Sequence, residues 1–129
     1  MEPEQINQCL FCVMPAERII ARNALAYAIR DGFPVTNMHS LVIPIRHAAD
    51  WFDITDEEAE ACNQLIRMVQ RDILKADPSV EGFNIGMNAG EVAGQTIFHC
   101  HIHLIPRRRG DVTNPRGGVR NVIPGKGNY

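Results

Sequence analysis

The most informative stretch of the chain is residues 94–105, Gly-Gln-Thr-Ile-Phe-His-Cys-His-Ile-His-Leu-Ile. Histidines 99, 101 and 103 alternate with apolar residues along this stretch. Successive side chains of a β-strand point to opposite faces of the sheet. The pattern therefore predicts a strand over residues 96–105, with three imidazoles on one face and an apolar face made by Phe98, Cys100, Ile102 and Leu104.

Elements on both sides of this stretch predict what the strand pairs with. Residues 18–22 and 24–30 suit two strands of a hairpin split by Asn23, and residues 39–45 and 83–89 read as two further strands. One long helix is expected over residues 56–76, because Thr55 followed by Glu58 forms a capping box. Apolar residues then recur at helical spacing until Asp77-Pro78 ends the helix.

These elements define one small α+β domain: an antiparallel sheet of about five strands with one long helix across a face. The chain has 129 residues, which is typical of a single domain. We expect the domain to occupy residues 1–111, with disorder over residues 1–8, and a Gly- and Pro-rich arm over residues 112–129.

Charge is divided unevenly along the chain. Residues 1–106 carry seven Lys/Arg against fourteen Asp/Glu, whereas residues 107–129 carry six against one. The basic end could contact phosphates or an acidic partner, or could simply be solvated, as we expect for most of Arg107, Arg108 and Arg109. An acidic body argues against broad nucleic-acid binding. With no apolar membrane span and an acidic N-terminus, we expect a cytoplasmic protein.

Histidine placement points to chemistry. His39 and His47 bracket the strand at residues 39–45, and the other three histidines form the alternating row. A lone histidine is usually a surface or satisfied core residue, but three in alternation between a glycine turn and an arginine cluster suit a row lining a polyphosphate. Metal binding by all three is a rival, although zinc sites commonly take only two ligands from one strand.

The stretch from Gly94 to Ile105 resembles the signature of the histidine triad (HIT) superfamily. Residues 39–47, His-Ser-Leu-Val-Ile-Pro-Ile-Arg-His, resemble a second strand of that family. Gly94-Gln95-Thr96, with Pro106-Arg107 and Gly110-Asp111, is most similar to the fragile histidine triad branch of dinucleoside polyphosphate hydrolases. Segments over residues 9–111 carry the likeness.

This resemblance implies a nucleotidyl hydrolase or transferase. His101 would attack the α-phosphorus of a dinucleoside polyphosphate and form a covalent nucleotidyl-histidine, releasing AMP after hydrolysis. His99 and His103 complete the catalytic row. The substrate-binding residues implied are Asp31, His39, Asn88, Gly94, Gln95 and Thr96. Nucleoside phosphoramidates are the alternative substrates, and no organic cofactor is expected.

Cys9 and Cys12 form a Cys-x-x-Cys pair, which in a reducing compartment is half a metal site or a redox pair. Cys62 reads instead as a small core residue. A subset of the HIT superfamily pairs such cysteines with two histidines around zinc, and the resemblance maps that set onto Cys9, Cys12, His47 and His99. The superfamily also implies a homodimer. A nucleotide- or zinc-responsive binding module with incidental turnover remains the rival function.

Overall fold

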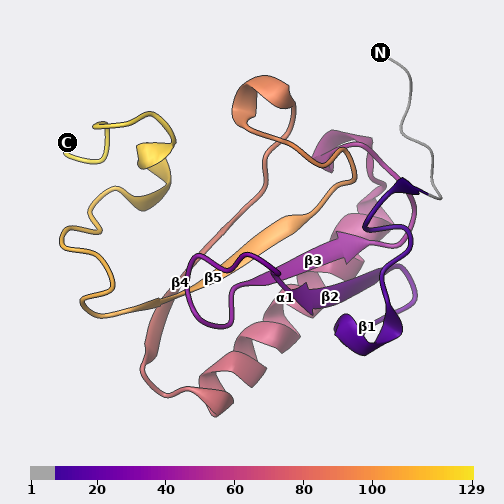
Figure 1. Cartoon of the computed structure of the whole chain (residues 1–129), viewed down its shortest axis with the longest axis horizontal. Coiled ribbons are helices and arrows are strands. Elements are labelled where there is room, and N and C mark those ends of the chain that lie inside the picture. The colour runs from indigo at the N-terminus through magenta and orange to yellow at the C-terminus, as the bar shows by residue number, and fades with distance from the viewer. Residues whose placement is uncertain (1–7) are drawn as a thin grey trace.

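The computed structural model describes residues 8–129. The expected disorder at the N-terminus lies, apart from Gln8, outside the described residues. Within the described residues the chain forms one five-stranded antiparallel sheet in the order β1-β2-β3-β5-β4, crossed by a single α-helix (Figure 1). The elements are β1 (Ile19–Arg22), β2 (Ala26–Arg30), β3 (Ser40–Pro44), α1 (Asp56–Ala76), β4 (Val80–Gly86) and β5 (Ile102–Arg108). This α+β architecture confirms the predicted fold class.

Helix α1 begins and ends where its sequence predicts. The Thr55 hydroxyl accepts the Glu58 amide at 3.1 Å, and the Glu58 carboxylate accepts the Thr55 amide at 2.8 Å. Four apolar residues spaced along the helix are buried: Cys62, Leu65, Val69 and Ile73. Burial raises the pKa of the Cys62 thiol to about 11, as expected for a small core residue rather than a reactive one.

Each face of the sheet has its own apolar cluster. The buried side of α1 packs on one face, against residues that include Ala26, Ala28, Val42, Ile102 and Leu104. On the other face, Tyr27, Ile29, Leu41 and Ile43 pack with Cys9 and Phe11 from the segment before β1. Because neighbouring side chains in a strand alternate, the odd-numbered residues of β2 and β3 face away from the helix. His103 of β5 lies on this second face.

The strand predicted over residues 96–105 is wrong in its first half and at its end. β5 begins at Ile102 and runs to Arg108, and β3 pairs with it only from Val42↔Ile102 to Ser40↔Leu104. No strand among residues 8–129 pairs with residues 96–101; the Cys100 amide instead donates to the Ala48 carbonyl at 2.7 Å. Likewise, the strand predicted over residues 83–89 is shifted to Val80–Gly86 because it follows the ladder with β5.

Two prolines lie within strands without interrupting the ladders that flank them. Pro44 lies past the last β3–β5 pair, where its carbonyl accepts a hydrogen bond from Nε2 of His99 at 2.7 Å. Pro106 lies past the other end of that ladder, opposite Phe83 of β4. A proline lacks the amide hydrogen that a ladder needs, and both prolines lie where the β3–β5 ladder has ended, although each still has a partner strand on its other side.

The arginine cluster is paired with acids of the domain. Arg107 forms two bonds of 2.8 Å with Asp111, Arg108 contacts Asp77, and Arg109 contacts Glu81. The arm that follows, residues 112–129, leaves the end of β5 (Figure 1), and its residues Gly118, Val119 and Asn121 line a cavity with Asn84 of β4 and Ile105 of β5. No helix within residues 8–129 is long and apolar enough to cross a membrane.

Candidate active site and metal centre

A cavity of about 360 Å³ lies on the face of the sheet opposite α1. Seven of the residues expected to act on a nucleotide line it: Asp31, His39, Asn88, Gly94, Thr96, His101 and His103. The rest of its wall is largely apolar, with Leu10, Phe11, Ile29, Phe33 and Leu41. An apolar pocket with a few convergent polar groups is the usual form of a small-molecule site.

His101 is held with one ring nitrogen engaged. Its Nδ1 lies 2.8 Å from the backbone carbonyl of His99. A carbonyl can only accept, so in the neutral imidazole Nδ1 carries the proton and Nε2 keeps its lone pair. The ring is half-buried at the cavity wall, and its centroid lies 5.4 Å from that of His103. The sequence could not show which group orients His101; the structure assigns this role to the carbonyl two residues earlier.

A second chain of bonds fixes the tautomer of His103. The Val35 amide donates to His39 Nδ1 at 3.1 Å, which leaves the proton of neutral His39 on Nε2. His39 Nε2 lies 2.9 Å from His103 Nδ1, so His103 accepts there and carries its own proton on Nε2. Burial lowers the pKa of His103 to about 4, aided by its neighbours His101 and His39. His103 is therefore a neutral hydrogen-bond donor near neutral pH.

Asp31 lies beside this chain. One carboxylate oxygen is 3.5 Å from His39 Nε2, and the other accepts the Phe33 amide at 2.8 Å. The bond to Phe33 shapes the turn that follows β2. The carboxylate thus lies at the cavity with capacity left to accept further hydrogen bonds.

Gln95 occupies a different place from the one its expected role suggests. Its side chain is buried, accepts the Gly90 amide and donates to the Ala49 and Ile97 carbonyls. It therefore organises the glycine turn and does not line the cavity. The Gly94 amide is also used within the turn, donating to the Glu91 carbonyl at 2.9 Å. Gly90 and Gly94 both have φ +98°, a conformation that strongly favours glycine.

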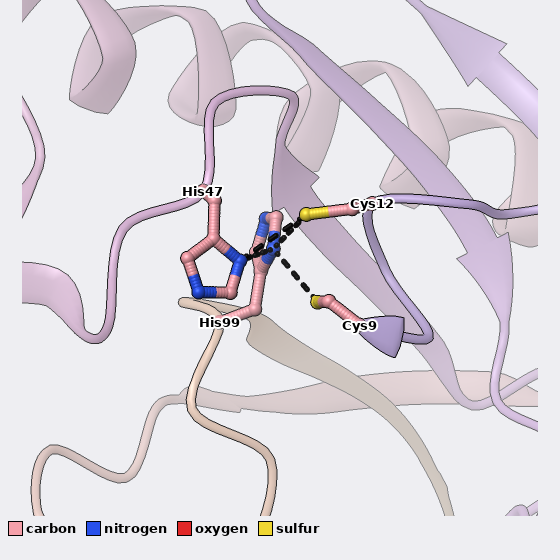
Figure 2. Close-up of side chains that lie close together, drawn as sticks. All are labelled: Cys9, Cys12, His47 and His99. Atoms are coloured by element: carbon pink, nitrogen blue, oxygen red, sulfur yellow. Dashed lines mark hydrogen bonds between the residues drawn. The ribbon is translucent and has the colours of Figure 1, made fainter. Parts of the chain in front are cut away.

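The four residues expected to hold zinc come together. Figure 2 shows Cys9 and Cys12 from the segment before β1, His47 after β3, and His99 before β5 converging on one point. The Nδ1 atom of His99 lies 3.4 Å from each sulfur and 3.2 Å from His47 Nδ1. Cys12 Sγ lies 3.1 Å from His47 Nδ1.

This donor set fits zinc. Tetrahedral zinc with ordinary ligand bonds separates sulfur from nitrogen by about 3.6 Å and nitrogen from nitrogen by about 3.3 Å, close to the separations seen here. His99 Nε2 lies 2.7 Å from the Pro44 carbonyl, so Nε2 carries the proton and Nδ1 points bare at the cluster. Two thiol sulfurs and two imidazoles are a common structural zinc set.

Sequence reasoning missed part of the site. The apolar wall, in particular Leu10, Phe11 and Phe33, was not among the expected binding residues, although Leu10 and Phe11 are the two residues between the metal-site cysteines. Their position between the two cysteines was the feature of the sequence that could have indicated their place near the site. His99 was expected in both the catalytic row and the metal set; its ring lies in the metal set, and its carbonyl serves His101.

Comparison with known proteins identifies the family. The HIT domain signature matches residues 14–110, so the chain belongs to the HIT family. A HIT-like protein of Mycoplasma genitalium is 35% identical over 111 residues, covering 83% of this chain and 78% of that protein.

Two other relatives have named activities. The AP-4-A phosphorylase of Mycobacterium tuberculosis is 34% identical over 72% of this chain and 48% of its own length. The adenosine 5′-monophosphoramidase of Schizosaccharomyces pombe is 33% identical over 77% of this chain and 74% of that protein. The chain is thus a HIT-family nucleotide hydrolase or transferase.

One solved structure with a similar fold is of a zinc-bound protein. The zinc-bound histidine triad family protein of Mycobacterium smegmatis has a TM-score of 0.76 and 32% identity, covering 85% of this chain and 82% of that one. Its zinc and the Cys/His cluster here are compatible with a zinc site in this chain.

Proposed function

We propose that this protein hydrolyses dinucleoside polyphosphates, or transfers their nucleotidyl group, through a covalent intermediate on His101. The single observation that carries the proposal is the bond between His101 Nδ1 and the His99 carbonyl, which leaves the Nε2 lone pair available at the cavity. A neutral imidazole with a bare nitrogen is the form that can attack phosphorus.

The reaction balances with the groups at the cavity. His101 Nε2 forms a bond to the α-phosphorus while the bond from phosphorus to the bridging oxygen breaks, and the leaving phosphate takes the electron pair. The carbonyl of His99 stabilises the positive charge that develops on the imidazole. Water then attacks the phosphorus and loses a proton to the solvent, the bond to Nε2 breaks with its electron pair returning to the nitrogen, and AMP leaves with the added oxygen.

His103 is suited to stabilise the charge that moves onto the phosphoryl oxygens. The bonds from Val35 through His39 direct its Nε2 proton outward from the chain of imidazoles. A fixed donor aimed at developing charge lowers the barrier more than one that must reorient. The Thr96 hydroxyl and Asn88 amide at the cavity wall are further donors in this scheme.

The other expected contacts divide into direct and indirect ones. Asp31 is proposed to accept ribose hydroxyls, and the apolar wall to hold the base. Gln95 and Gly94 are proposed to act through the shape of the turn that carries Thr96, because their polar groups are bonded within that turn.

Zinc is proposed to be bound by Cys9, Cys12, His47 and His99. When bound, it would supply a structural cross-link of three chain segments. Elemental analysis should find about one zinc per chain, and Cys9→Ser should lower this value while Cys62→Ala, in the core, should not. A preparation that has never met a chelator and is nevertheless metal-free, folded and active would refute the zinc site.

The decisive experiment for the nucleophile is trapping. Incubation with radiolabelled diadenosine tetraphosphate and quenching in base should yield an acid-labile nucleotide adduct at residue 101. We expect His101→Ala to lower AMP release about a thousandfold or more and to keep its affinity for AMP. Undiminished turnover in this variant would refute the mechanism.

A direct comparison of two substrates tests which leaving group the protein prefers. Nucleoside phosphoramidates share the attack at the α-phosphorus, and the phosphoramidase relative supports them as the alternative substrates. Measuring kcat/KM for diadenosine tetraphosphate and for adenosine 5′-phosphoramidate separates the two. A larger value for the phosphoramidate would assign the protein to the alternative.

A homodimer is part of the proposal, with cytoplasmic action. β4 is an edge strand of the sheet, and Ile85 in it is 51% exposed. An unpaired edge with an exposed apolar residue suits pairing with a second copy. Light scattering of the purified chain should give twice the mass of one chain; a monomer at micromolar concentration would contradict this.

A further inference from the structure

Phe11 lies between the metal cluster and the proposed nucleophile. In sequence it falls between the two cluster cysteines, and its side chain is only 4% exposed. Its ring centroid lies 5.0 Å from that of His101 and 5.9 Å from that of His99, the latter in an edge-to-face arrangement. Ring contacts at these distances are attractive and directional. One buried ring therefore touches both a metal-site imidazole and the nucleophile.

The segment that carries Phe11 is a turn outside the sheet. The Cys12 and Val13 amides donate to the Cys9 carbonyl, and the Tyr27 hydroxyl donates to the Phe11 carbonyl at 2.5 Å. The cysteine side chains reach across to His47 and His99 on other segments (Figure 2). The metal cluster thus connects this turn to the segment that precedes β5.

The same turn is also a wall of the cavity. Leu10 and Phe11 both line it, together with His101, His103 and Asp31. Leu10 is 49% exposed, so its side chain is available to a ligand. The position of this turn therefore determines the shape of the nucleotide site, and it also determines how Phe11 packs against His101.

We infer that the metal cluster holds Leu10 and Phe11 in place as a wall of the cavity, and that zinc occupancy thereby sets the affinity of the cavity for a nucleotide. The inference rests on the proposed function. Without the metal, the contacts between the cysteine sulfurs and the imidazoles are weak hydrogen bonds, because a thiol is a poor donor. The turn then loosens, and the wall formed by Leu10 and Phe11 loses its fixed position.

A purely structural metal would behave differently. It would change the free energy of unfolding but would leave the AMP affinity of the folded protein unchanged. The coupling between zinc and AMP binding therefore distinguishes the two roles, and by linkage each ligand should strengthen binding of the other by the same factor.

The test measures AMP dissociation constants by calorimetry for zinc-loaded and zinc-stripped protein. In the wild type, stripping should weaken AMP binding about tenfold. Phe11→Leu should weaken binding by a similar factor while retaining zinc, and its affinity should then respond little to stripping. Phe52→Leu, on a residue that is 81% exposed and outside the cavity, should behave like the wild type.

The outcomes separate the claims. Equal AMP affinity with and without zinc in folded wild-type protein overturns the inference and leaves the proposed function intact. If stripping unfolds the chain, as circular dichroism would reveal, the metal holds the whole fold and not this wall in particular, and the inference is likewise overturned. A protein that binds no AMP in any form refutes the proposed function itself.

Discussion

The ring nitrogen that carries the proton determines what each histidine can do. Three protein carbonyl or amide groups assign the proton: the His99 carbonyl for His101, the Pro44 carbonyl for His99, and the Val35 amide for His39. His101 thus presents a lone pair, His99 presents a metal ligand, and His103 presents a proton. Three residues of identical chemistry are given three roles by their hydrogen-bond partners.

The lowered pKa of His103 makes stability depend on pH. Its pKa is about 4 in the folded protein and about 6.5 when unfolded. Between these values the unfolded chain binds a proton that the folded chain does not, so stability falls as pH falls through this window. We expect this group to cost about 2 kcal/mol of unfolding free energy between about pH 7 and pH 5.

Urea unfolding at both pH values, for the wild type and His103→Asn, measures the effect. The variant should lose less stability on acidification than the wild type does. Because the cysteine–histidine cluster is common to both proteins, the difference between them isolates residue 103. Equal losses would show that His103 is not held neutral by its surroundings.

At the scale of elements, the helix and the loops differ in how far sequence predicts them. Helix α1 was predicted at both ends because its capping box and its terminating Asp77-Pro78 are local signals. The start of β5 was not, because strand length depends on how far β3 extends beside it. The alternation of the histidines was nonetheless enough to predict that their side chains share one face, opposite the apolar residues between them.

The candidate site divides in the same way. The resemblance to the HIT superfamily implied the members of both clusters, Asp31 with the histidines and the cysteines with His47 and His99, and the structure brings each cluster together. The buried bonds of Gln95 and the contact of Phe11 with His101 depend on tertiary packing between distant segments. The Arg46–Glu58 ion pair, between the chain after β3 and α1, was missed for this reason.

The capping box gives a prediction that belongs to the helix alone. Thr55→Ala removes the hydroxyl that accepts the Glu58 amide and should lower the free energy of unfolding by about 1 kcal/mol. Gln64→Ala, at an exposed position in the middle of α1, is the matched control and should change it little. Thermal or urea unfolding measures both. A Thr55→Ala protein as stable as the control would mean that Glu58 alone caps the helix.

At the scale of the whole molecule, three ion pairs show where the excess positive charge of residues 107–129 lies. Arg107, Arg108 and Arg109 are neutralised by Asp111, Asp77 and Glu81 within the domain. The excess positive charge is therefore confined to the arm, on Arg116, Arg120 and Lys126. Arg116 and Arg120 both lie over the Tyr129 ring, at 5.1 and 4.4 Å from its centroid. The arm thus has a local organisation of its own.

Deleting residues 112–129 tests whether this arm serves catalysis or a partner. None of its residues lines the histidine cavity, so kcat/KM for diadenosine tetraphosphate should stay within about twofold of the full-length value, a change too small to reflect a lost contact to the transition state. If the arm docks an acidic partner, that binding should be lost with the deletion and weakened by salt. The triple variant Arg116→Gln, Arg120→Gln, Lys126→Gln keeps the arm and removes its charge, so it separates electrostatic docking from packing. Loss of hydrolysis on deletion, with AMP binding retained, would instead make the arm part of the catalytic apparatus.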